Sequence, residues 1–140
     1  MPAVFRHRMV VPESAIDRNG HVNNVVFVQW MQDIAVRHFK SVGGSAPMEA
    51  VNGGWVVRTH KVEYLAPAFA AEEIEVRTWV EGFSRVRSLR RYEFERIADS
   101  RLLVRGETDW VFVEAATGRP MAIPDQIKAI FDIGSQSSPQ

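Results

Sequence analysis

The sequence predicts an α+β fold in which one long apolar helix packs against an antiparallel sheet. Residues 25–42 contain neither Gly nor Pro and are rich in apolar side chains, which is typical of a buried helix of about five turns. The segments that follow are strand-like, because β-branched and aromatic residues dominate them. The last of these segments are joined by links too short for anything but antiparallel neighbours.

The composition limits both the number of domains and the classes of function. The chain has 140 residues, with 17 basic and 17 acidic side chains and no cysteine. This length suits one domain, and a balanced charge gives no reason to expect nucleic-acid binding. The absence of cysteine excludes disulfides, thiolate metal sites and a cysteine nucleophile. We expect one domain over residues 1–133 and a disordered Ser- and Gln-rich tail over residues 134–140.

The N-terminal segment lacks the features of a targeting signal. It carries Arg6, His7 and Arg8 and has no apolar core of the kind that a signal peptide needs. No segment contains the roughly 18–20 apolar residues of a membrane span. We therefore expect a cytoplasmic protein without a membrane-spanning segment.

The predicted elements follow one another as strand, helix, four strands and a short helix. The first strand covers residues 4–11, and the long helix ends before Gly43 and Gly44. Apolar residues occupy most of the helix circumference, which predicts burial on several sides by a sheet that curves around it. The later elements are expected over residues 55–65, 72–80, 86–97 and 102–113 for the strands, and 124–131 for the short helix.

A motif ahead of the helix is similar to a known family signature. Residues 17–24 read Asp-Arg-Asn-Gly-His-Val-Asn-Asn, and Phe27 and Trp30 follow. This run resembles the signature of the hotdog thioesterases, which include the 4-hydroxybenzoyl-CoA thioesterase-like and the acyl-carrier-protein thioesterases. Residues 62–68 and 117–124 resemble later landmarks of the family. The resemblance implies the hotdog fold, a long central helix wrapped by a curved antiparallel sheet.

The helix start suits thioester hydrolysis, which needs a polarised carbonyl, a nucleophile and a place for negative charge on oxygen. A helix N-terminus offers free N–H groups and a positive dipole end. We expect the backbone around Asn23, Asn24 and Val25 to bind the thioester oxygen. A simple Asn-capped helix is the structural alternative.

The resemblance implies catalytic roles for three residues upstream. Asp17 would be a general base or a nucleophile, with a turn-capping role as its alternative. Asn19 would hold the thioester or position the carboxylate, and His21 would orient water or the substrate carbonyl. Gly20 suits either a backbone position beside a ligand or a plain turn.

A basic segment and the tryptophans are further candidates for substrate contacts. The resemblance implies that Arg85 and Arg87 lie near the pantetheine exit and bind a phosphate of coenzyme A or of a carrier protein. Solvated strand arginines are the alternative, also for Arg90 and Arg91. Most tryptophans are expected in the core or an interface, and one or two could line an acyl pocket.

The sequence therefore predicts a hydrolase that cleaves an acyl-CoA or acyl-carrier-protein thioester to a free acid and a thiol. No metal or other cofactor is expected beyond the coenzyme A or phosphopantetheine of the substrate. A homodimer or homotetramer would cover the sheet edge and form the site at a subunit interface. The alternatives are a non-catalytic acyl-thioester binding protein and a hotdog-fold dehydratase or hydratase. Ala66, where many relatives carry arginine, leaves the substrate class open.

Overall fold

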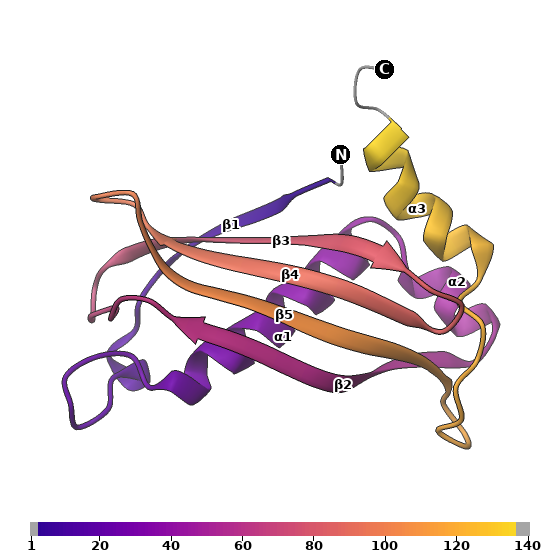
Figure 1. Cartoon of the computed structure of the whole chain (residues 1–140), viewed down its shortest axis with the longest axis horizontal. Helices are drawn as coiled ribbons and strands as arrows, with labels where there is room; N and C mark the ends of the chain where they lie inside the picture. The colour runs from indigo at the N-terminus through magenta and orange to yellow at the C-terminus, as the bar shows by residue number, and fades with distance from the viewer. Residues whose placement is uncertain (1–2, 137–140) are drawn as a thin grey trace.

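Five antiparallel strands form one sheet in the order β1-β3-β4-β5-β2, and the long helix α1 runs along one face of it (Figure 1). This computed structural model describes residues 3–136, with side chains as far as Phe131. The strands are β1 (Phe5–Val10), β2 (Gly53–Tyr64), β3 (Glu73–Phe83), β4 (Arg87–Arg96) and β5 (Arg101–Glu114). The helices are the 3-10 turn η1 (Glu13–Ala15), α1 (Asn24–Ser41), α2 (Ser45–Ala50) and α3 (Asp125–Gln136).

The predicted α+β architecture and its five strands are confirmed, with small shifts at the ends of the elements. The short helix α2 was not predicted, because six residues are too few to show a helical period. Helix α3 is longer than expected and extends to Gln136, three residues into the segment expected as a tail. Residues 137–140, the rest of that segment, lie outside the described residues.

Local signals explain where α1 begins and ends. The Asn23 side chain caps the first turn by accepting a hydrogen bond from the Val25 N–H at 2.9 Å. At the other end Gly43 has φ +83, and its N–H donates to the Lys40 carbonyl at 3.1 Å. Glycine is favoured there because other residues are strained in the left-handed conformation that closes a helix.

The helix is buried along one stripe only, which differs from the expectation of burial on several sides. The stripe contains Phe27, Met31, Ile34, Ala35, His38 and Phe39. On the outward side Val25 and Val36 are 74% and 48% exposed. The sheet of one chain therefore covers only the inner side of α1, and apolar residues on the outer side have no cover within the described residues.

Aromatic side chains fill the space between α1 and the sheet. The Phe94 ring lies edge-on to Phe27, with centroids 5.2 Å apart, and is fully buried. Gly106 brings β5 close to the helix, since a Cβ there would lie 2.9 Å from the Met31 sulfur. The core therefore depends on a small residue on the strand opposite a large one on the helix.

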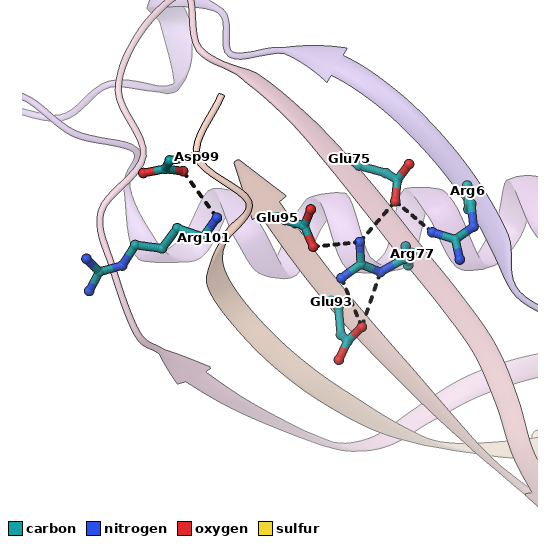
Figure 2. Close-up of polar contacts among 7 residues, drawn as sticks. All are labelled: Arg6, Glu75, Arg77, Glu93, Glu95, Asp99 and Arg101. Atoms are coloured by element: carbon teal, nitrogen blue, oxygen red, sulfur yellow. Dashed lines mark hydrogen bonds and ion pairs between the residues drawn. The ribbon is translucent and has the colours of Figure 1, made fainter. Parts of the chain in front are cut away.

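The outer face of the sheet is polar and carries a network of ion pairs (Figure 2). Arg77 is at its centre, with Glu75, Glu93 and Glu95 carboxylates 2.9, 3.1 and 3.0 Å from its guanidinium. Arg6 extends the network from β1 by pairing with Glu75 at 2.8 Å. Every charge of this cluster thus has an opposite charge beside it. Across residues 3–136, no helix combines the length and apolar character needed to cross a membrane.

We expect Phe94→Ala to lower the free energy of unfolding by about 3–5 kcal/mol, because it leaves a cavity at the centre of the core. Val10→Ala is the matched control, since Val10 is 60% exposed and a surface truncation should change stability by no more than about 0.5 kcal/mol. Urea unfolding measures both. Equal losses in the two variants would contradict the described core.

Candidate functional site

The loop that contains Asp17 is a tight turn directly ahead of α1. The Asp17 N–H donates to the His21 carbonyl at 3.0 Å, and the Asp17 carbonyl accepts from the Gly20 N–H at 3.0 Å. Gly20 has φ +86 and no heavy atom within 4 Å of the position that a Cβ would take. Glycine is favoured at this position by backbone conformation and not by crowding.

Backbone hydrogen bonds hold this loop against the rest of the domain. The Val22 N–H donates to the Ala68 carbonyl at 2.9 Å, and the Asn23 N–H donates to the Ala15 carbonyl at 3.0 Å. The Tyr64 hydroxyl, at the end of β2, donates to the Asn24 carbonyl at 2.9 Å. The loop is therefore fixed on both sides of the helix start, which keeps its polar side chains in place.

The side chain of Asp17 is half-buried and takes part in the turn. Its Oδ1 accepts the Asn19 N–H at 2.8 Å, which is the turn-capping role expected of many loop aspartates. No residue in the described part of the chain donates a hydrogen bond to Oδ2. One carboxylate oxygen thus shapes the turn, and the other has no hydrogen-bond donor among the described residues.

Asn19 and His21 stand on either side of Gly20 in the same loop. Asn19 is exposed, and His21 is half-buried. The His21 Nδ1 lies 3.4 Å from the Val22 carbonyl oxygen, and its ring is edge-on to Phe69 with centroids 6.5 Å apart. The structure therefore brings the three predicted catalytic residues into one short loop.

The amides at the helix start differ in what they already bind. The Asn23 N–H is used by Ala15, and the Val25 N–H is used by the Asn23 side chain. The Asn24 N–H has no acceptor in the region that the structure describes. No acidic residue occupies the first turn, so the positive dipole end has no charged side chain to offset it. Asn24 is thus the predicted amide donor left open.

Arg85 and Arg87 lie at the other end of the sheet from this loop. Tyr64 marks the loop end of the sheet, since its hydroxyl donates to the Asn24 carbonyl. The N–H of the next residue, Leu65, donates to the Leu103 carbonyl near the start of β5, whereas Arg87 pairs with Val111 near the end of β5. Eight residues of strand separate those two points of β5, which is roughly 27 Å. Arg87 forms an ion pair with Asp109, and Arg85 is exposed. One chain alone does not bring either arginine to Asp17.

A cavity of about 240 Å³ lies between the second half of α1, α2 and the sheet. Its apolar walls come from Phe39, Met48, Trp55 and Trp110, and its polar groups include Ser88 and Arg90. Two of the tryptophans thus line a cavity, as expected for an acyl pocket. In Figure 1 the Asp17 loop and α2 are at opposite ends of α1, so the cavity is remote from the loop of the same chain.

The interpretation of Arg90 as a solvated strand arginine is wrong, because its side chain is buried. Its exposure is 4%, and its Nη1 lies 2.8 Å from His38 Nδ1 and 3.1 Å from Thr78 Oγ1. Burial lowers the pKa of Arg90 to about 10. The strand period could have revealed this, because Arg90 is in phase with Ser88, Tyr92 and Phe94, which also face α1.

The sequence model of the acyl-ACP thioesterase N-terminal domain matches residues 2–131. The chain belongs to the acyl-ACP thioesterase family. The predicted recognition of a hotdog thioesterase and the hotdog fold class are confirmed. No curated protein sequence matches the chain.

Several solved structures superimpose closely on this family member. A Staphylococcus aureus protein in complex with CoA has a TM-score of 0.88 at 18% identity, over 100% of this chain and 89% of that one. A 1,4-dihydroxy-2-naphthoyl-CoA thioesterase from Synechocystis has a TM-score of 0.82 at 17% identity, over 93% of this chain and 96% of that one. The 12:0-ACP thioesterase from Umbellularia californica has a TM-score of 0.83 at 21% identity, over 94% of this chain and 50% of that one. This thioesterase-family chain therefore spans half of that enzyme.

Among the side chains of this family member that the structure describes, no three His, Asp or Glu residues gather as they would around a metal ion. The His38 imidazole instead accepts a hydrogen bond from Arg90. Burial, and to a lesser degree the charge of Arg90, lowers the pKa of His38 to about 4 from the ordinary value of 6.5. His38 is therefore neutral in the folded protein at neutral pH.

We expect this shift to make stability pH-dependent. The pKa of His38 is about 4 in the folded chain and 6.5 when unfolded, so between these values the unfolded chain binds more protons. The contribution of neutral His38 to the free energy of unfolding is complete above about pH 6.5 and is lost as the pH falls towards 4. From pH 7.5 to pH 5 the loss is about 2 kcal/mol.

His38→Gln should flatten this part of the pH profile, since glutamine accepts the Arg90 hydrogen bond without titrating. Urea unfolding of both proteins at several pH values gives the two slopes. Identical slopes would contradict a neutral, buried His38.

Proposed function

We propose that this protein hydrolyses the thioester of an acyl-CoA or acyl-carrier protein at the loop ahead of α1. The observation that carries the proposal is the place of Asp17 in an anchored turn directly ahead of α1, whose first residue, Asn24, has an N–H with no acceptor among the described residues. In a member of a thioesterase family, these are the groups that thioester hydrolysis requires.

The helix start would stabilise the charge that develops on the thioester oxygen. The Asn24 N–H would donate to this oxygen, and the helix dipole would add a partial positive charge. His21 and Asn19 would orient the carbonyl or the attacking water from the same loop. Val25 and Asn23 would act indirectly, because the cap that joins them fixes the direction of the first turn.

Asp17 would supply the base or the nucleophile. As a base, its carboxylate takes a proton from water, and the water oxygen attacks the carbonyl carbon. The tetrahedral intermediate then collapses, the carbon–sulfur bond breaks, and the thiolate takes a proton. As a nucleophile, the carboxylate displaces the thiolate to form an anhydride, which water opens. Both routes yield a free acid and a thiol, with no cofactor beyond that of the substrate.

A non-catalytic acyl-thioester binding protein is the second candidate. The observation in its favour is that Asp17 Oδ1 already accepts the Asn19 N–H, so the carboxylate has a structural use. The names of the similar structures include CoA and ACP as carriers, which favours a thioester ligand in either case.

We also propose a homodimer, or a homotetramer built from such dimers, in which two β2 strands pair about a two-fold axis. Strand β2 is an edge of the sheet with 12 residues, and Val56 on it is 47% exposed. Antiparallel pairing would set the Tyr64 end of one copy beside the Trp55 end of the other. The Asp17 loop of one subunit would then face the cavity, Arg85 and Arg87 of its partner.

Asp17→Asn should reduce kcat/KM for acyl-CoA hydrolysis by at least about 100-fold, because an amide provides neither a base nor a nucleophile. The turn should remain, since the asparagine oxygen still accepts the Asn19 N–H. Release of free thiol measures hydrolysis, and calorimetry with a non-hydrolysable thioether analogue measures binding.

Asp33→Asn is the matched control, because Asp33 is exposed on α1 and bonded only to Gln29 in the described part of the chain. It should retain full activity. If the unaltered protein binds the analogue but releases no thiol from any acyl-CoA, the binding protein is the correct alternative.

Val56→Lys should shift the protein towards a monomer and reduce hydrolysis with it. A lysine on the edge strand opposes pairing with a second edge. Sedimentation velocity gives the mass, and thiol release at the same concentrations gives the activity. A variant that is monomeric and fully active would rule out a site shared between subunits.

A further inference from the structure

Arg90 is a buried cation whose protein contacts are neutral. Its two hydrogen-bond partners, His38 and Thr78, carry no charge, since the pKa of His38 is about 4. No Asp or Glu carboxylate lies within ion-pair distance of Arg90 in the part of the chain whose side chains are described. Burial of a charge without a counter-ion is costly, so such a group needs an explanation.

The other arginines with mostly buried side chains are compensated. Arg77 and Arg96 are 14% and 13% exposed, and each lies beside two or more carboxylates. Figure 2 shows the carboxylates around Arg77 on the outer face of the sheet. Arg90 lies on the opposite face of the adjacent strand, where no such cluster exists among the described residues.

The guanidinium of Arg90 is held in a fixed orientation, and Arg90 is one of the residues that line the cavity. His38 and Thr78 both bind Nη1, and the Phe131 ring centroid lies 5.9 Å from the guanidinium carbon. Within the described chain Nε and Nη2 have no acceptor, and Arg90 and Ser88 belong to the cavity wall. Two parallel N–H donors on a fixed planar cation match the two oxygens of a carboxylate.

The rest of the cavity suits an apolar stem. Phe39, Met48, Trp55 and Trp110 provide its walls, and its volume is about 240 Å³. That is room for about eight groups the size of a water molecule. A short carbon chain or a ring that ends in a carboxylate would place its apolar part against the tryptophans and its charge at Arg90.

We propose that this cavity binds the distal part of an acyl group that ends in a carboxylate, with the Arg90 guanidinium as its counter-ion. The inference rests on the proposed hydrolase function and names the substrate class of that site. From Asn24 to Val36 the axis of α1 rises about 18 Å, so the loop of the same chain is too far from the cavity for a short acyl group. In the proposed dimer the thioester would lie at the loop of the second copy.

The test compares two thioesters that differ only at the distal end, octanedioyl-CoA and octanoyl-CoA. The unaltered protein should favour octanedioyl-CoA in kcat/KM by about 10- to 100-fold, the range of a hydrogen bond between charged groups. Arg90→Met should abolish this preference or reverse it, because the carboxylate would then meet an apolar wall.

Arg77→Met is the matched control, with the same substitution on the neighbouring strand. It should lose stability, since three carboxylates lose their partner, but keep the preference for octanedioyl-CoA. Arg90→Met should remain folded, because replacing an uncompensated buried charge by an apolar side chain is well tolerated. Circular dichroism and urea unfolding check both variants.

Binding of the free acids is a measurement that needs neither hydrolysis nor a variant. Octanedioate should raise the Tm of the unaltered protein and give a calorimetric signal, whereas octanoate should bind at least about tenfold more weakly. Failure of octanedioate to bind any better than octanoate would overturn the inference.

The outcomes separate this inference from the proposed function. Equal hydrolysis of both thioesters, unchanged in Arg90→Met, overturns the carboxylate site and leaves the hydrolase intact. Tight binding of octanedioate that is lost in Arg90→Met, with no hydrolysis of either thioester, supports the site and overturns the hydrolase.

Discussion

The packing of the buried stripe of α1 against the sheet, with Met31 over Gly106, holds the helix in place, and both functional regions of the molecule depend on it. A Cβ at position 106 would lie 2.9 Å from the Met31 sulfur, so the end of the Met31 side chain would have to turn away from β5. With the helix held there, its N-terminus lies at the Asp17 loop and its second half at the cavity. Two sites with different chemistry are thus positioned by the packing of one helix on the sheet.

Most of the fold could be predicted because its signals are local. Apolar runs mark the helix and the strands, and short connections make the strands antiparallel. What could not be predicted depends on contacts between distant segments. The exposed outer side of α1, with Val25 and Val36, follows from the sheet's covering one side only. In the sequence, the same apolar residues predict burial on several sides.

In the candidate site, too, the local features could be predicted, and those that depend on distant contacts could not. The loop from Asp17 to His21 is contiguous in sequence, so a motif could identify it. The motif does not indicate which helix amides stay open. The Val25 N–H donates to the Asn23 side chain, and the Asn23 N–H donates to the Ala15 carbonyl. The separation of Arg87 from this loop is a property of the whole sheet, and no local pattern encodes it.

The position of the charges gives the last argument about function. On the outer face, water and carboxylates solvate each guanidinium, and exposed arginines need no further partner. On the inner face, Arg90 has two neutral acceptors among the described side chains for its five N–H donors. An apolar side chain there would remove the cost of burying the charge, although the His38 Nδ1 would lose its donor. The bonds to His38 and Thr78 use one nitrogen of the guanidinium, and in the proposed site the other N–H donors bind the anion that enters the cavity.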